Sequence, residues 1–143
     1  MIKYLTEGAV SADQIASEIE KLGRRKDTGG HSIFLGQVRD DICNGRKVTA
    51  IEYSAYEEMV SSEAEKIKEI IINEFSDVLG LVIIHSIGVV LAGEISMFVL
   101  VSAGHRDHAT TACRKAVELI KENLPVWKKE LFDDKTHQWK KNE

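Results

Sequence analysis

Apolar residues recur along the chain with two different periods, and these periods predict helices and strands by turns. Spacings of three and four positions mark residues 11–22, 57–75 and 107–123. Such spacing places the apolar side chains of each segment on one helix face. Ser11 and Gln14 add a capping box, in which each side chain bonds the backbone amide of the other residue. The pattern therefore predicts three amphipathic helices.

Between these helices, short runs rich in β-branched residues predict strands that are joined in pairs. Asn44-Gly45 is a typical hairpin turn, and residues 92–94 form a second turn signal. Gly36 predicts a bulge or a close backbone approach within its strand. The run at residues 95–101 is almost wholly apolar, so we expect this strand to be covered on both faces. The predicted strands are residues 31–38, 47–56, 81–91 and 95–101.

The order helix, hairpin, helix, hairpin, helix predicts an α+β fold with helices packed on an antiparallel or mixed sheet. The length of 143 residues fits a single domain that spans residues 1–143. Residues 130–143 are mostly charged or polar, and we expect them to form a weakly ordered tail apart from Trp139.

The only proline, Pro125, predicts an abrupt end of the last helix near Asn123 or Leu124. Proline lacks an amide hydrogen and disfavours helix at the residue before it. We expect Trp127 to anchor the turn that follows. Lys121 then comes from the helix and Lys128 from the next segment. Two ammonium groups that converge from separate segments predict a site for an anion or an acyl group.

The net charge of −4 is unevenly distributed. Residues 1–104 hold 10 Lys and Arg against 16 Asp and Glu, whereas residues 105–143 hold 9 against 7. Nucleic-acid binding needs a broad basic face, which this distribution does not provide. A local pocket for a small anion remains compatible with it. No apolar run approaches the roughly 20 residues that cross a bilayer, so we expect no membrane association.

The two cysteines, Cys43 and Cys113, form no CxxC pair, which argues against a zinc knuckle or a redox motif. Unpatterned cysteines are typical of a reducing compartment, and we expect a cytoplasmic protein. The first residues are too short and too polar for a signal peptide. His85 lies within an apolar strand, where a histidine is more often part of the core.

Three clusters could carry chemistry. The junction at residues 102–107 places His105 and Arg106 at the start of the last helix, where amides and the helix dipole favour anions. Asp107 could equally cap that helix, with its two neighbours on the surface.

Arg39 follows a strand and could bind an anion or pair locally with the acidic residues after it. A partly buried lysine beside other cations has a lowered pKa, and can act as an acid, a base or an acyl acceptor.

A metal site is the alternative interpretation of the histidines. His105 and His108 are three positions apart and can share a helix face, and Cys113 is the nearest further ligand type. Cys113 lies five positions beyond His108 and points elsewhere on a helix. We therefore expect no bound metal, and we expect Cys113 to pack as a small hydrophobic residue.

Five short motifs occur in an order that resembles the large, catalytic subunit of molybdopterin synthase. The resemblance covers about residues 30–139, and the five motifs together are far more specific than any one. They are Phe34-Leu-Gly-Gln-Val-Arg39, Ile51-Glu-Tyr53, Gly93-Glu94, Val101-Ser-Ala-Gly-His-Arg106 and Pro125-Val-Trp-Lys-Lys-Glu130.

This resemblance implies a hammerhead-like α/β fold and a sulfur-transfer reaction. A small ubiquitin-like carrier subunit supplies sulfur as a thiocarboxylate on its C-terminal Gly-Gly. The acceptor is cyclic pyranopterin monophosphate, in which two sulfurs form the dithiolene of molybdopterin. It also implies a homodimer of the large subunit within a heterotetramer. We expect no cofactor. By motif, Lys121 and Lys128 are the expected catalytic residues. The expected substrate-binding residues are Arg39, His105, Arg106 and Phe34.

Two other functions are compatible with the same residues. A non-catalytic module could use the basic pocket to hold a phosphorylated small molecule or a protein tail. A metal-dependent hydrolase could use His105 and His108.

Overall fold

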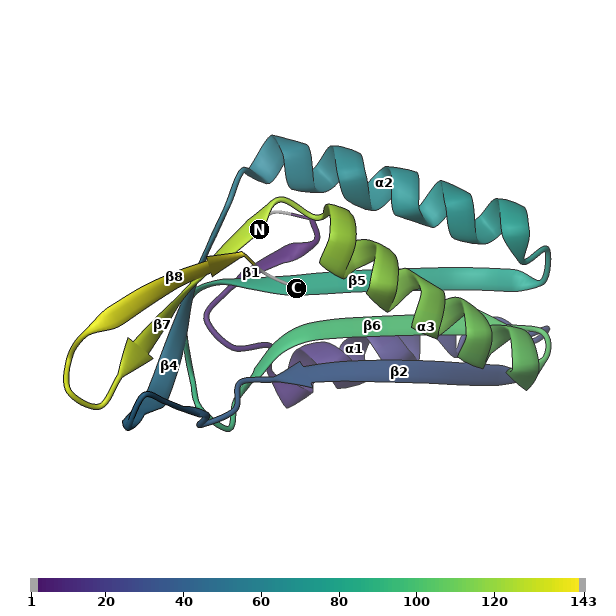
Figure 1. Ribbon diagram of the computed structural model, residues 1–143. Coiled ribbons are helices and arrows are strands. Elements are labelled where there is room, and N and C mark those ends of the chain that lie inside the picture. The colour runs from purple at the N-terminus through teal and green to yellow at the C-terminus, as the bar shows by residue number, and fades with distance from the viewer. Residues whose placement is uncertain (1–2, 142–143) are drawn as a thin grey trace.

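The computed structural model describes residues 3–141 and consists of one strongly bent, mostly antiparallel sheet with helices on both faces (Figure 1). The strand order is β2-β6-β5-β4-β7-β8, with β1 parallel to β5 and β3 antiparallel to β4. The helices are α1 (Ala12–Leu22), α2 (Glu57–Glu74) and α3 (Arg106–Asn123). The strands are β1 (Leu5–Glu7), β2 (Gly30–Gln37), β3 (Ile42–Cys43), β4 (Arg46–Ala55), β5 (Val78–Leu91), β6 (Ile95–Ala103), β7 (Val126–Phe132) and β8 (His137–Lys141). The predicted α+β class is confirmed.

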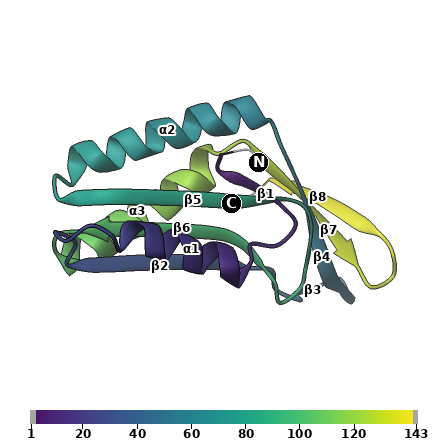
Figure 2. The same cartoon turned by 180° about the vertical axis from the view of Figure 1, so that it is seen from behind.

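The two faces of the sheet are covered by different helices. Helices α2 and α3 lie on one face, and α1 lies on the other, as the view from behind shows (Figure 2). Strand β6 is buried between them from Ser96 to Ala103, which confirms the prediction of a strand covered on both faces. Among the described residues, no helix has the length and apolar character that crossing a membrane requires.

The helix predictions are confirmed in detail. Ser11 and Gln14 form the capping box of α1, in which the backbone amide of Gln14 donates to the Ser11 hydroxyl at 3.1 Å. Helix α3 ends at Asn123, one residue before Leu124 and two before Pro125. The buried residues of α2 are Val60, Ala64, Ile67 and Ile71, which recur at the predicted spacings of three and four. Those of α3 are Ala109, Ala112, Cys113, Ala116 and Ile120, so Cys113 does pack in the core.

The first predicted hairpin is wrong. The Asn44-Gly45 turn has the positive φ angles of a type I′ turn, 53° and 77°, but it joins only the two-residue β3 to β4. Strand β2 pairs instead with β6 over its whole length, with a bulge at Gly36 as predicted. A full-length partner offers β2 more backbone hydrogen bonds than the strand that follows it in sequence.

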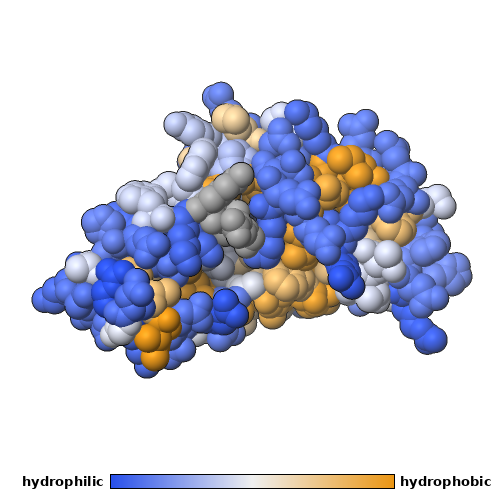
Figure 3. Space-filling view, in the orientation of Figure 1, coloured by the Kyte–Doolittle hydropathy of each residue, from blue (hydrophilic) through white to orange (hydrophobic). Residues whose placement is uncertain are grey.

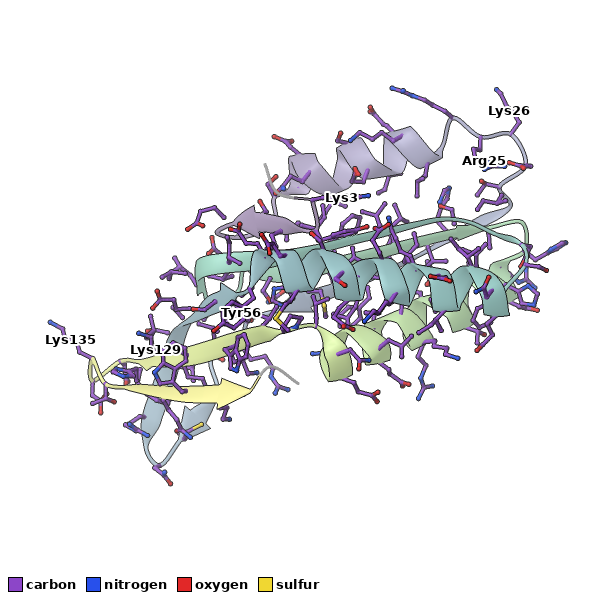
Figure 4. All side chains as sticks on the ribbon, turned by 90° about the horizontal axis from the view of Figure 1, so that it is seen from above. Lys3, Arg25, Lys26, Tyr56, Lys129 and Lys135 are labelled. Atoms are coloured by element: carbon purple, nitrogen blue, oxygen red, sulfur yellow. The ribbon has the colours of Figure 1, made fainter. Side chains whose placement is uncertain are left out.

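The predicted weakly ordered tail is also wrong, because residues 126–132 and 137–141 form an antiparallel hairpin. Strand β7 alternates buried and exposed residues, with Val126, Glu130 and Phe132 facing inward. The same alternation puts Trp127 on the outer face, 41% exposed, where it meets Tyr56 edge-on at 5.4 Å. Trp127 therefore does not anchor the turn from inside. Figure 4 shows Tyr56 beside this hairpin, with Lys129 and Lys135 on it. Residues 142–143 of the predicted tail lie outside the described residues.

A close backbone approach joins the start of β2 to the start of α3. A methyl group added at Gly29 would lie 2.1 Å from the Gly104 carbonyl oxygen. We expect Gly29→Ala to cost on the order of 2–3 kcal/mol, because backbone on both sides must move. Thermal unfolding should show a Tm about 10 °C lower. Gly104→Ala is the matched control, since the nearest atom to its added methyl is 3.6 Å away. Equal Tm values for the two variants would contradict the packing argument.

Candidate active site

A cavity of about 430 Å³ lies where the sheet bends. Strand β5 pairs with β6 as far as His85, and with β4 from Gly88 onward, so it passes from one part of the sheet to the other. The end of β2, the end of α3 and the inner face of the β7–β8 hairpin enclose the space beside this bend. Its lining includes Phe34, Arg39, Asp41, Tyr53, His85, Ser96, Lys121, Lys128, Glu130 and Lys140.

Lys121 enters the cavity from the last turn of α3. It is half-buried, and its pKa lies below the ordinary 10.5, first because burial penalises the ammonium and then because Lys128 is positively charged. The helix ends two residues later, so the backbone beyond Pro125 is free to continue as β7. Pro125 thus separates the two lysines into different elements, as predicted from the sequence.

Lys128 lies in the middle of the β4-β7-β8 part of the sheet. It pairs with Tyr53 on one side and with Lys140 on the other. Glu130, two positions along the same face, is 5% exposed and lies 3.3 Å from the Lys140 ammonium. The hairpin therefore presents two lysines and one paired carboxylate to the cavity.

Arg39 and Phe34 complete one wall. Phe34, on β2, is half-buried and packs against the core. Arg39 follows β2, and its side chain is 81% exposed, with one guanidinium nitrogen 3.4 Å from Asp41. An exposed ion pair of this kind contributes about 0–1 kcal/mol, so Arg39 can exchange Asp41 for an anion at little cost.

His85 is a cavity residue that the sequence analysis assigned to the core. It is 2% exposed, and its ring meets the Tyr53 ring edge-on at 5.0 Å. The pKa of His85 is lowered to about 4, chiefly by burial; a hydrogen bond to Ser86 opposes this shift, and the charges of Lys121 and Lys128 add to it. No local sequence signal marks this position, because the lysines reach it from distant parts of the chain.

His105 and Arg106 lie at the opposite end of α3 from Lys121. Fifteen residues of α-helix separate Arg106 from Lys121, which is about 22 Å. Both side chains are exposed, and neither lines the cavity of this chain. The structure thus brings Phe34, Arg39, Lys121 and Lys128 together but leaves these two residues elsewhere.

Asp77 fixes the start of α3. One of its carboxylate oxygens accepts from the His105 backbone amide at 3.1 Å and from the His105 ring at 3.2 Å, and the other accepts from His108. Burial raises the pKa of Asp77, but these hydrogen bonds outweigh it and hold the pKa below 3.8. The N-cap residue of α3 is therefore His105, whose amide is bonded by Asp77, and not Asp107, the capping residue considered from sequence, which lies in the first turn.

The described part of the chain contains no group of three or more His, Cys, Asp or Glu side chains that could hold a metal ion. The set considered from sequence is not assembled. His108 bonds to Asp77, and Cys113 is buried in the core, where burial raises the pKa of its thiol. The histidines therefore give the metal-dependent hydrolase no support.

Comparisons with known proteins identify one family. A family model described as MoaE protein matches residues 5–123. The molybdopterin synthase catalytic subunit of Dictyostelium discoideum is 40% identical over 117 residues, which are 80% of this chain and 73% of that protein. The one from Pyrococcus abyssi is 43% identical over 107 residues, 75% of this chain and 71% of that protein.

Solved structures of molybdopterin synthase subunits have a similar fold. The crystal structure of molybdopterin synthase from Staphylococcus aureus superposes with a TM-score of 0.85 at 27% identity and covers 96% of each chain. A complex of subunits 1 and 2 of the molybdopterin-converting factor from Helicobacter pylori has a TM-score of 0.81 at 24% identity, over 98% of this chain and 90% of that one. At that identity, the second likeness shows the fold alone.

Proposed function

The chain belongs to the MoaE family, and we propose that it catalyses a sulfur-transfer reaction. The relatives that it matches are molybdopterin synthase catalytic subunits, which act in molybdenum cofactor biosynthesis. The donor is the thiocarboxylated C-terminus of a small ubiquitin-like carrier subunit. The acceptor is cyclic pyranopterin monophosphate, and the product is the dithiolene of molybdopterin. The two cysteines are both free, which is compatible with the cytoplasmic location that we propose.

The observation that carries this proposal is the shared cavity of Lys121, Lys128 and Arg39. The three cations come from the end of α3, from β7 and from the loop after β2. A thiocarboxylate and a phosphate are both anions, so one cavity with several cationic donors suits both reactants. We assign Phe34 to the wall that the substrate contacts.

We assign the main catalytic role to Lys121. The thiocarboxylate sulfur attacks a carbon of the pterin side chain and replaces a carbon–oxygen bond there, and the oxygen leaves as water or with the opened phosphate ester. Water then cleaves the acyl–sulfur bond, which leaves the sulfur on the pterin and a carboxylate on the carrier. Negative charge develops on the acyl oxygen during that cleavage. A fixed ammonium in a partly desolvated cavity stabilises such charge far better than water does. Lys128 positions the substrate or transfers a proton.

His105 and Arg106 join the site if two copies pair through β2. Strand β2 is an edge strand that exposes Ile33 and Leu35, and hydrophobic surface is visible along it (Figure 3). A free edge of this kind is a template for pairing with another strand. An exposed apolar edge thus supports the homodimer that we propose within a heterotetramer.

The direction of α3 determines what such pairing brings together. The start of α3 lies against Gly30, at the beginning of β2, whereas Lys121 shares the cavity with Gly36, near its end. In an antiparallel pair of β2 strands about a two-fold axis, the beginning of one strand lies beside the end of the other. The second copy would then present its own His105 and Arg106 next to this chain's cavity, as further donors for the phosphate.

The proposed carrier must place its flexible Gly-Gly end inside the cavity. Glycine has no side chain, so its backbone passes where other residues cannot. The Helicobacter pylori fold neighbour is a complex of subunits 1 and 2 of the molybdopterin-converting factor, and we propose a small-subunit partner for this chain as well.

Reconstitution tests the reaction. The purified protein is mixed with a thiocarboxylated carrier and cyclic pyranopterin monophosphate, and the dithiolene product is followed by chromatography of its oxidised fluorescent derivative. We expect product with the thiocarboxylated carrier and none with the plain carboxylate carrier. Binding of both reactants without product would favour the non-catalytic module and reject the enzyme.

A further inference from the structure

We propose that His85 is a positioning residue for sulfur transfer: its Nε2 atom accepts a hydrogen bond from the lysine pair and directs the Lys121 ammonium within the cavity. This inference rests on the proposed function of the same cavity. It concerns a residue to which neither the sequence motifs nor the family likeness assigns a role.

The position of the ring is fixed from several sides. His85 belongs to the buried part of β5, and its backbone amide donates to the Tyr4 carbonyl at 2.8 Å. Tyr53 holds the ring edge-on, and the Tyr53 hydroxyl is itself hydrogen-bonded to Ser96 at 3.1 Å. A ring held in this way can direct another side chain, because it cannot turn aside itself.

One hydrogen bond decides which ring nitrogen carries the proton. The Nδ1 atom lies 2.8 Å from the Ser86 carbonyl oxygen, which can only accept. We therefore assign the hydrogen to Nδ1, and in a neutral imidazole Nε2 then has a lone pair. Because burial and both lysines hold the pKa of His85 to about 4, the ring is neutral at physiological pH.

The surroundings of the ring explain why a neutral acceptor is useful here. The titratable and charged groups that share the cavity are Lys121 of α3, Lys128 and Glu130 of β7, Lys140 of β8, Tyr53 of β4, and Arg39 and Asp41 of the loop after β2. The two carboxylates, Glu130 and Asp41, are paired with Lys140 and Arg39. A carboxylate in place of His85 would cancel the charge of Lys121. A neutral imidazole orients the ammonium and leaves its full charge for an anionic reactant.

Three substitutions separate acceptance by Nε2 from simple filling of space. His85→Gln retains an acceptor near the Nε2 position, His85→Asn retains only the contact of Nδ1 with Ser86, and His85→Phe retains only the ring. We expect the Asn and Phe variants to lose about 10–100-fold in kcat, the value of one hydrogen bond to a charged group, and the Gln variant to stay within about threefold. The KM for the carrier should be unchanged. His137→Gln, on exposed β8, is the matched control.

The pH profile distinguishes positioning from a structural role. Accepting a hydrogen bond favours the charged form of Lys121, so losing the acceptor lowers the pKa of Lys121. The basic limb of kcat should therefore move to lower pH in the Phe and Asn variants and stay in place in the Gln variant. A fall in kcat without that movement, or equal damage in the Gln and Phe variants, would overturn the inference.

A second measurement does not depend on activity. In protein labelled with ¹⁵N-histidine, the His85 spectrum should show a neutral ring protonated at Nδ1. Lys121→Met should shift the Nε2 resonance and raise the pKa of His85, since a positive charge is removed. An unchanged Nε2 resonance would reject the inference. If the wild-type protein were inactive, the proposed reaction would be rejected instead. The spectrum would still show whether Nε2 of His85 contacts Lys121.

Discussion

Replacing Lys121 by alanine should lower the kcat of sulfur transfer by roughly 10²–10³-fold, the loss typical of removing one group that stabilises a developing oxyanion. Lys121 is half-buried in the cavity beside Lys128, where its charge is screened less than on the surface. Its removal leaves α3 intact, because alanine favours helix and a lysine near a helix C-terminus contributes only about 0.3–1 kcal/mol. Reconstitution under single-turnover conditions measures the loss directly.

Lys115→Ala is the matched control on the same helix. Lys115 forms an ion pair with Glu74 and does not line the cavity. Its removal should change kcat less than about twofold and stability by about 0–1 kcal/mol. Full activity of the Lys121→Ala protein would reject the proposed role, whereas equal losses in both variants would point to a general defect of the helix.

The ionisation of Lys121 predicts the direction of a pH effect. Burial and the charge of Lys128 lower the pKa of Lys121. Its ammonium therefore loses its proton at a lower pH than that of an ordinary lysine, whose pKa is 10.5. In Lys128→Gln the neighbouring charge is gone, and Lys121 keeps its proton to higher pH. The basic limb of the residual activity should therefore move upward, opposite to the shift expected for His85→Phe.

Mixing two inactive variants should restore activity if the site is shared between copies. Arg106→Ala and Lys121→Ala protein, dissociated and reassociated in equal amounts, should recover about a quarter of wild-type activity. Half of the dimers then contain one copy of each variant. In each of these, one site receives Lys121 from one copy and Arg106 from the other, and is intact.

The control mixture combines Lys121→Ala with Lys128→Ala. Both lysines line the cavity of one chain, so every site in a mixed dimer lacks one of them. No recovery is expected. If the Arg106→Ala and Lys121→Ala mixture also fails to recover, the two residues do not meet across a dimer. The separation of about 22 Å along α3 would then leave Arg106 outside the site.

The local structure was largely predictable because it depends on neighbours in sequence. The capping box of α1, the buried stripe of α2 and the end of α3 before Pro125 all follow from spacings of a few residues. The segregation of Lys121 and Lys128 into separate elements was predictable for the same reason. The resemblance of the motifs then identified the family, which the comparisons support independently.

Strand pairing was not predictable in the same way. A good turn at Asn44-Gly45 suggested that residues 31–38 and 47–56 pair, yet β2 pairs with β6, some sixty residues later in the chain. The charged residues after Glu130 suggested disorder, yet β8 gains a partner in β7. In both cases, the backbone hydrogen bonds that a strand gains by pairing outweigh what local composition indicates.

The sequence by itself therefore determined the helices, most strands and the residue types available for chemistry. Only the tertiary structure decided which of them meet. It brought Arg39, Lys121 and Lys128 to one cavity, added His85 from a strand that looked purely structural, and placed His105 and Arg106 at the far end of α3. The physical reason is that the bend of β5 and the direction of α3 are set by packing across the whole sheet, which no short stretch of sequence records.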